Sequence, residues 1–218
     1  MKKITLLLFT FVLCAISASA QGESSEKKVV AEPVDLGLPS GTKWATCNVG
    51  ATVPEELGDY FAWGEIETKE SFKREEYLHI KPGQESVMAI RREFADLGKD
   101  IAGTQYDVAH VKWGGNWVMP NLAQVQELEQ HCTWTWETVN GTNGYKITSK
   151  KNGNSIFLPA AGSKASQRTS NINFYGLYWT SKLYGPSDAY NFLLEKDNNN
   201  HRQMALRSMG FSVRPVMK

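Results

Sequence analysis

The four histidines of this chain do not form a recognisable metal centre. They are His79, His110, His131 and His201, and none has a partner at the spacing of a His-x-x-x-His pair or beside a Cys-x-x-Cys pair. His131 is followed directly by Cys132, but neighbouring side chains diverge on a helix. The sequence therefore predicts no metal and no other cofactor.

Two acidic side chains come closer to an arrangement that does chemistry. Glu65 and Glu67 are two residues apart, so on a strand they would share one face at a separation of roughly 7 Å. Paired carboxylates can flank a glycosidic bond and hydrolyse it. Nothing else in the sequence marks a catalytic cleft around them, so a solvated strand face is the preferred interpretation.

Other chemical motifs are weak or missing. Asp197-Asn198-Asn199-Asn200 carries oxygens that could bind calcium, although its position favours a polar hairpin turn. The sequence contains no Gly-x-Ser-x-Gly and no phosphate-binding glycine loop. Asn140-Gly141-Thr142 matches a glycosylation sequence, and we interpret it as a turn. We therefore expect that the protein is not an enzyme.

Cys47 and Cys132 are the two cysteines that follow residue 20. In an oxidising compartment two cysteines favour a disulfide, and chain-entropy arithmetic gives a bridge over this loop length roughly 4.6 kcal/mol of stability. Two buried free thiols, which behave as small apolar side chains, are the alternative. The spacing alone does not decide between them.

The segment 161–175 is the strongest candidate for ligand binding. It is rich in Gly, Ser and Asn and has no hydrophobic period, so we expect a long loop, and long loops in compact domains are often functional. The candidate ligand-contacting residues in this segment and just after the next strand are Arg168, Asn171, Asn173, Tyr175 and Tyr184. Side chains that merely solvate the loop are the alternative.

The tryptophans suggest a core held together by aromatic rings. Each indole brings a large apolar surface and an N–H that needs a partner when buried. Exposed rings would also suit flat sugar rings, but most of the tryptophans lie in strand-like blocks, so burial is the preferred interpretation. The seven residues are Trp44, Trp63, Trp113, Trp117, Trp134, Trp136 and Trp179.

Two segments have the apolar spacing of helices. Between residues 87 and 97 apolar side chains recur every three or four residues, and Gly98 follows as a stop. In the second helix, Asn121 and Gln124 have the spacing of a capping box, ahead of an apolar pattern that reaches Leu128.

Most of the remaining structure is expected to be short antiparallel strands. Segments 145–149 and 155–158 flank Asn152-Gly153, a pair typical of a type I′ hairpin turn. Residues 190–195 are expected to pair with residues 207–216 around the polar turn between them. Further strands are expected at 43–49, 60–63 and 176–181.

The first 20 residues have the pattern of an export signal. A basic start precedes the apolar run 4–16, and Ala18-Ser19-Ala20 is a small-residue cleavage site. The run is shorter than the about 20 apolar residues that span a bilayer, and no later run approaches that length. Lipid attachment at Cys14 is disfavoured because the preceding Leu13 is not small.

The rest of the chain is expected to form one domain after a tether. Residues 21–33 are polar and charged and lack the apolar side chains that offset ordering entropy, so we expect them to be flexible. Residues 34–218 are long enough for a sizeable core. Removal of the signal takes away two lysines and no acid, which changes the formal net charge from +1 to −1. This balance gives no electrostatic footprint for nucleic acid.

The tryptophan and glycine blocks together resemble a known bacterial family. The opening block, residues 34–51, is similar to the first signature of the Fibrobacter succinogenes major paralogous domain. One departure is Val118, where the family would place an arginine that anchors a local ion pair. The resemblance covers essentially the whole domain, and the later blocks follow in order at 58–65, 109–117, 156–162, 178–181 and 212–216.

The resemblance implies a loop-rich α+β structure of the C-type-lectin-like fold, with two principal helices and short antiparallel strands. This fold also includes the formylglycine-generating enzymes. Their oxidation chemistry needs reactive thiols late in the domain, and no cysteine follows Cys132. Calcium-dependent sugar binding would need a Glu-Pro-Asn or Gln-Pro-Asp motif, which is absent.

From these observations we expect an exported protein, whether periplasmic, on the cell surface or secreted, without a transmembrane segment after the signal. Its expected role is to bind a carbohydrate or a partner protein without catalysis. A purely structural surface protein is the alternative, and an enzyme of the formylglycine-generating fold is a more distant one.

Overall fold

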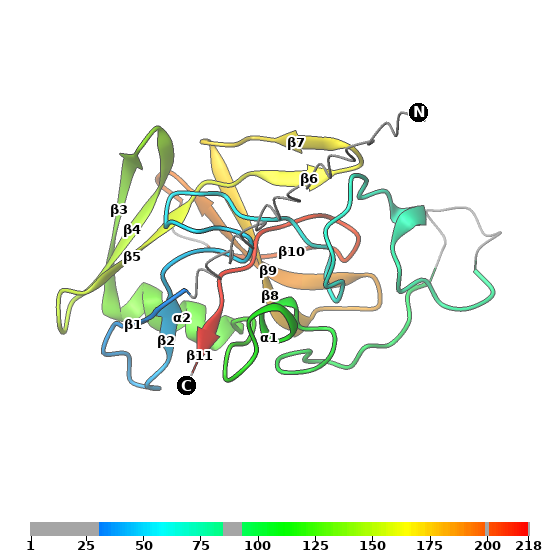
Figure 1. The fold of residues 1–218 in the computed structure, drawn as a ribbon, viewed down its shortest axis with the longest axis horizontal. Coiled ribbons are helices and arrows are strands. Elements are labelled where there is room, and N and C mark those ends of the chain that lie inside the picture. Colours follow the sequence, from blue (N-terminus) through cyan, green and yellow to red (C-terminus); the bar gives the residue numbers. More distant parts are fainter. Residues whose placement is uncertain (1–30, 85–92, 199–200, 218) are drawn as a thin grey trace, which may run out of the picture.

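The computed structural model describes residues 31–84, 93–198 and 201–217. Within these ranges the chain forms small antiparallel sheets with few helices, which agrees with a loop-rich α+β structure (Figure 1). The helices are α1 (Val108–Trp113), α2 (Leu122–His131) and the short 3-10 helix η1 (Arg74–Glu76). The strands are β1 (Pro33–Asp35), β2 (Lys43–Ala45), β3 (Cys132–Val139), β4 (Thr142–Ser149), β5 (Ser155–Pro159), β6 (Ser163–Ala165), β7 (Arg168–Ser170), β8 (Tyr175–Leu183), β9 (Asp188–Glu195), β10 (Arg202–Leu206) and β11 (Val216–Met217).

The sheet β3-β4-β5 is built from two consecutive hairpins. The β4–β5 hairpin is confirmed, but its type I′ turn is wrong, because Gly153 has positive φ and Asn152 does not. The side chain of Asn152 instead donates to Asp35 O at 2.9 Å, which ties a longer loop to β1. The two-residue turn with both φ values positive is Asn140-Gly141, between β3 and β4. The prediction of a turn at that sequence is thus confirmed, and it belongs to a hairpin that the sequence analysis missed.

The sheet β10-β9-β8 corrects one predicted strand pairing. Strand β9 pairs with β8 and with β10, so residues 190–195 do not pair with residues 207–216. The segment 207–216 instead crosses between sheets. There Phe211 bridges Phe61, and Val216 pairs with Trp44 in the sheet β1-β2-β11. In this position the apolar side chains of 207–216 are buried against several parts of the core. A hairpin with 190–195 at the surface would leave more of them in water.

Helix α2 follows its sequence pattern closely. Asn121 accepts a hydrogen bond from the Gln124 N–H, and the Gln124 side chain accepts one from the Asn121 N–H, so the capping box is confirmed. The other predicted helix, 87–97, lies mostly outside the described residues. Its described end is not helical, and Phe94 forms an isolated bridge with Ile80.

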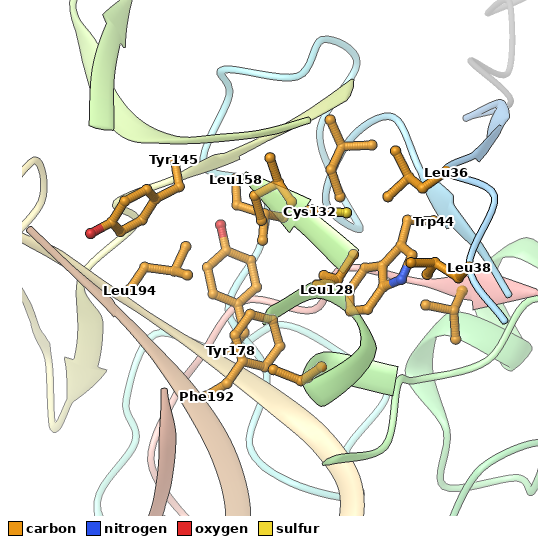
Figure 2. Packing of buried hydrophobic residues seen from close by; sticks show 14 residues of the cluster. Leu36, Leu38, Trp44, Leu128, Cys132, Tyr145, Leu158, Tyr178, Phe192 and Leu194 are labelled. Carbon is orange, nitrogen blue, oxygen red and sulfur yellow. The ribbon is translucent and has the colours of Figure 1, made fainter. Parts of the chain in front are cut away.

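The largest core cluster lies where the sheet β3-β4-β5 and α2 meet strands β8 and β9 (Figure 2). Tyr178 and Phe192 stack in it with ring centroids 5.0 Å apart, and Trp44 meets Phe192 edge-on at 6.4 Å. A second cluster contains Trp63 and Trp179, whose indole N–H groups donate to backbone carbonyls at 2.9 and 2.8 Å. Four of the tryptophans are therefore buried as expected, namely Trp44, Trp63, Trp117 and Trp179. The other three are partly exposed, namely Trp113, Trp134 and Trp136.

Cys47 and Cys132 are buried free thiols in the structure and do not form a disulfide. Cys132 packs in the first core cluster and Cys47 in a separate one that includes Trp117. Burial raises the pKa of both thiols, which keeps them protonated and unreactive at neutral pH.

We expect these thiols to resist modification until the protein unfolds. In protein that starts at residue 21, an aromatic disulfide reagent at pH 8 should label neither thiol within minutes in buffer, because both are buried. It should label both of them, Cys47 and Cys132, in denaturant without reductant. Absorbance of the released thiolate reports the count, and no reactive thiol in denaturant would show a bridge.

No helix among the described residues is both long enough and apolar enough to cross a membrane.

Candidate functional site

The segment predicted to be a long ligand-binding loop is largely a hairpin. Residues 163–165 and 168–170 form β6 and β7, which pair antiparallel around a tight connection where Ser166 has a φ of 52°. The prediction of one long loop over 161–175 is therefore wrong. Polar side chains in short alternating strands give no hydrophobic period, which explains why the pattern was not visible in the sequence.

The structure does not bring the five predicted ligand residues to one place. Asn173 fixes the neighbouring β3–β4 turn, because its carboxamide oxygen accepts from the Asn143 N–H at 2.8 Å. Asn171 donates to the Tyr175 hydroxyl at 2.8 Å. Arg168 is exposed on β7. Tyr184 follows β8 and packs edge-on against Tyr190 at 5.1 Å.

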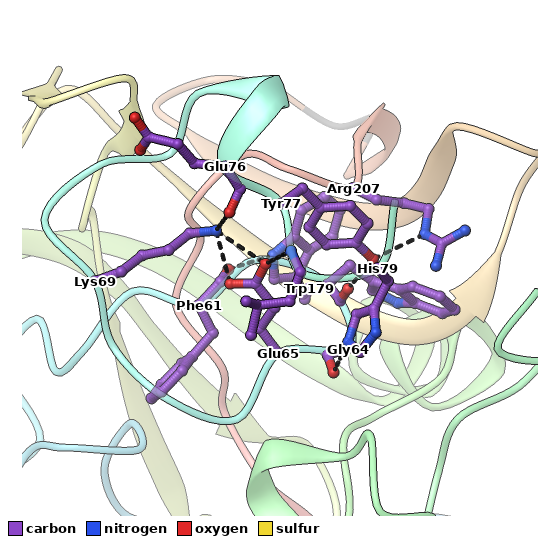
Figure 3. A network of polar contacts seen from close by, with 11 residues as sticks. Phe61, Gly64, Glu65, Lys69, Glu76, Tyr77, His79, Trp179 and Arg207 are labelled. Atoms are coloured by element: carbon purple, nitrogen blue, oxygen red, sulfur yellow. Dashed lines mark hydrogen bonds and ion pairs between the residues drawn. The ribbon is translucent and has the colours of Figure 1, made fainter. Parts of the chain in front are cut away.

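The Glu65–Glu67 pair also fails as a site, because neither residue lies on a strand and each has its own cation. Glu65 is buried and pairs with Lys69 at 2.7 Å, and it accepts the Leu78 N–H at 2.8 Å (Figure 3). Glu67 is exposed and pairs with Lys112 at 3.1 Å.

The polar groups around Glu65 in Figure 3 also have hydrogen-bond partners within the protein. Tyr77 donates to Trp63 O at 2.6 Å, and Arg207 donates to the Tyr77 hydroxyl at 3.1 Å. This network holds the loop that follows Phe61 against the core and has a structural role.

A more promising site is an aromatic cleft of about 370 Å³. It lies where the end of α2 and the strands β3 and β4 meet the connection between β9 and β10. The volume lies within the range of roughly 300–1,000 Å³ that is common for small-ligand sites. The lining residues, which define the aromatic cleft here, are Glu129, Trp134, Trp136, Tyr145, Asp197, Asn198 and His201.

Strand geometry places three of the aromatic side chains together. Trp134 and Trp136 are two residues apart on β3, so they share one face of the sheet. Tyr145 on β4 is the cross-strand partner of Trp136 and lies on the same face. Because β3 is an edge strand, the two indoles lie at the border of the core and are partly exposed.

The rings are held in a defined arrangement. Trp134 stacks on His201 with centroids 4.4 Å apart and an interplanar angle of 15°. Trp134 and Trp136 meet the Tyr145 ring edge-on at 5.4 and 4.9 Å. The Trp134 indole N–H donates to Leu128 O at 3.1 Å, which fixes this ring to the last turn of α2. Such fixed aromatic walls are ready to receive a flat ligand.

The opposite wall of the aromatic cleft is anchored through backbone groups. The Tyr145 hydroxyl donates to Glu195 O at 3.0 Å, and burial raises the pKa of Tyr145. The His201 ring donates through Nδ1 to Leu193 O at 2.7 Å. Asn198 donates to the Glu195 carboxylate at 2.9 Å, and Asp197 has a φ of 64°. Residues 197–198, the described part of the turn predicted at 197–200, thus form one rim of the cleft.

The charged groups of the aromatic cleft are all acidic. Glu129 and Asp197 are exposed at its rim, and neither forms an ion pair with a residue that the structure describes. The residues described around the cleft include no lysine or arginine. The described residues contain no group of three or more His, Cys, Asp or Glu side chains that could hold a metal.

Comparison with known proteins identifies no relative: no family model, curated protein or solved structure matches the chain. The function is therefore argued from the cleft itself.

The sequence carried a signal for this cleft. The alternation Trp134-Thr135-Trp136 predicts a strand with both indoles on one face. Nothing in the sequence places Asp197 or His201 beside this strand, so the sequence indicates only a polar turn and an isolated histidine there.

Proposed function

We propose that this protein is an exported, non-enzymatic binding module that takes up a carbohydrate in the aromatic cleft. The observation that carries the proposal is the placing of Trp134 and Trp136 beside a cavity, while four other tryptophans are fully packed. Leaving large aromatic surface in water forgoes roughly 25 cal/mol for each Å². Partly exposed rings that line a cavity are therefore suited to a ligand.

The chemistry of the aromatic cleft suits a sugar. The apolar C–H face of a sugar ring can pack on an indole, as flat rings and aliphatic groups do on aromatic side chains. Its hydroxyl groups can donate to the carboxylates of Glu129 and Asp197 and can bond with the amide of Asn198. A few polar groups at the edge of an aromatic pocket are typical of sites that orient a small ligand.

Two features of the sequence support the same proposal. The pattern of the first 20 residues is that of an export signal, which would expose the protein to glycans outside the cytoplasm. The order of its tryptophan and glycine blocks resembles the Fibrobacter succinogenes major paralogous domain, whose lectin-like fold is compatible with ligand binding. The lack of nucleophile and metal motifs supports a role without catalysis.

Binding is expected to depend on Trp136. A glycan array probed with protein that starts at residue 21 should identify ligands, and calorimetry should then measure their affinity. The substitution Trp136→Ala is expected to weaken binding about tenfold or more, because an aromatic contact contributes about 0.5–1.5 kcal/mol beyond the area that it buries. Trp134→Ala should have a similar effect.

Two controls make this result specific. Trp113→Ala removes another partly exposed tryptophan, one that packs against Trp117 and lies outside the aromatic cleft, so affinity should stay within about twofold. The double substitution Arg168→Ala with Tyr175→Ala should also leave affinity unchanged. Thermal unfolding of each variant checks that it is folded at the temperature of the binding measurement.

Other outcomes would contradict the proposal. Binding that survives Trp136→Ala but is lost with the Arg168 and Tyr175 substitutions would place the site on the β6–β7 hairpin. Cleavage of a bound oligosaccharide would contradict the non-enzymatic role. No binding to any glycan would favour a purely structural surface protein.

A further inference from the structure

We propose that the ligand of the aromatic cleft carries a positive charge, as a saccharide with a protonated amine. This inference rests on the proposed function and narrows its ligand class. It follows from the combination of aromatic rings and uncompensated carboxylates around one cavity.

The charge of the aromatic cleft differs from that of three other cavities of the protein. A cavity of about 250 Å³ on the sheet β3-β4-β5 contains Glu55 and Glu137 together with Lys146. A cavity of about 330 Å³ beside Tyr60 has two acids and two lysines. A cavity of about 530 Å³ near the start of α2 has no Asp, Glu, Lys or Arg. Of these four cavities, only the aromatic cleft has acidic residues without a lysine or arginine among the described residues that line it.

The two carboxylates are available to a ligand. Both side chains lie at the rim of the cleft. Glu129 belongs to the C-terminal part of α2, and Asp197 to the connection after β9. Neither carboxylate accepts a hydrogen bond from a described side chain or forms an ion pair with a described residue. An ammonium group entering between them could donate charge-assisted hydrogen bonds to both.

The aromatic rings favour the same charge. A cation near the face of an indole or phenol ring is attracted by the negative face of the π-system, and several rings around one site are the usual means of holding an organic ammonium group. Tyr145 and His201 are buried and lie against Trp134, with Trp136 beside Tyr145. A neutral sugar packs on the rings and offers only hydroxyl groups to the carboxylates, whereas an amino sugar adds a cation that both the carboxylates and the ring faces attract.

The test compares two oligosaccharides that differ only in charge. Calorimetry at pH 6 and low salt would measure binding of the β-1,4-linked tetramer of glucosamine and of its fully N-acetylated counterpart. We expect the glucosamine tetramer to bind about tenfold more tightly, which corresponds to about 1.4 kcal/mol. The difference should shrink in 0.5 M NaCl, because salt screens exposed charges.

Matched variants assign the effect to the aromatic cleft. The double substitution Glu129→Gln with Asp197→Asn should reduce the preference to below about threefold, because it removes both charges. The amide oxygens of glutamine and asparagine still accept hydrogen bonds from hydroxyl groups, so the acetylated tetramer should lose less affinity than the glucosamine tetramer. The control substitution Glu55→Gln with Glu137→Gln removes the same net charge from a different cavity and should keep the tenfold preference. Thermal unfolding again confirms that the variants are folded.

The outcomes separate this inference from the proposed function. Equal affinity for the two tetramers, both lost with Trp136→Ala, overturns the inference and leaves the proposed function intact. A preference that persists in the Glu129 and Asp197 variant also overturns it. Binding of neither tetramer, when a neutral glycan binds through Trp136, overturns the inference alone. Absence of binding to any glycan overturns both.

Discussion

Replacing Arg214 by methionine is expected to lower the free energy of unfolding by about 3–5 kcal/mol. The guanidinium is fully buried and forms no ion pair with any carboxylate in the part of the chain that the structure describes. It donates instead to Asn48 Oδ1 at 2.8 Å, to the carbonyls of Ala45 and Thr46 at 3.0 and 2.8 Å, and to Phe157 O at 2.9 Å. Methionine fills a similar volume and makes none of these bonds, so three buried acceptors and one partly buried acceptor lose their donor.

Lysine at this position should recover only part of the loss, because one ammonium group cannot reproduce the planar fork of donors. Burial lowers the pKa of Arg214 to about 10, so the side chain is still charged at neutral pH. Urea unfolding at pH 7 measures the effect as a lower midpoint with an unchanged slope. Arg168→Met, at an exposed arginine, is the control and should change stability by less than about 0.5 kcal/mol. A loss below about 1 kcal/mol for Arg214→Met would contradict the proposed role.

The substitution Asp107→Asn is expected to cost about 3 kcal/mol of stability although it changes one atom group. The buried carboxylate accepts four backbone hydrogen bonds. Oδ1 caps α1 by accepting from the Ala109 and His110 N–H groups at 2.9 and 3.2 Å. Oδ2 accepts from the Gly103 and Met119 N–H groups at 2.9 and 3.0 Å.

An asparagine can keep one of these oxygens but must turn its NH₂ group toward two backbone donors. Two backbone N–H groups then have no acceptor from this side chain. One of each pair, that of Ala109 or that of Met119, is buried, and an unsatisfied buried donor costs about 1–3 kcal/mol. Burial raises the pKa of Asp107 although these hydrogen bonds lower it, because removing the charged carboxylate from water is unfavourable. Urea unfolding checks the prediction, with Asp35→Asn as an exposed control that keeps its local turn. Equal midpoints for Asp107→Asn and the unmodified protein would contradict it.

Local patterns in the sequence predicted those parts of the fold that depend on neighbours in the chain. The capping box at Asn121 and Gln124 is confirmed because its two bonds span three residues. The β4–β5 hairpin is confirmed because its two strands are close neighbours in the chain. Its turn is not the predicted type, and there Asn152 bonds to the distant Asp35. Such long-range contacts leave no periodic trace in a sequence.

The candidate site was not predicted because its residues come from four separate segments. Trp134 and Trp136 alternate visibly, but only the fold brings Glu129, Tyr145 and His201 beside them. The predicted site was placed on a segment chosen for its polar composition, and composition does not distinguish a ligand loop from an exposed hairpin such as β6–β7. The buried role of Arg214 was equally hidden, since its partner Phe157 lies 57 residues away.

The sheet β1-β2-β11 has a consequence for how the protein reaches its folded state. Strand β2 pairs on one side with β1 and on the other with residues 216–217. The segment 211–216 also bridges Phe61, Val118 and Tyr178. A chain that needs so distant a strand cannot close this sheet while the last residues of the domain are still being made, and contacts of this kind fold slowly. This sheet is therefore completed only after residues 216–217 have been made.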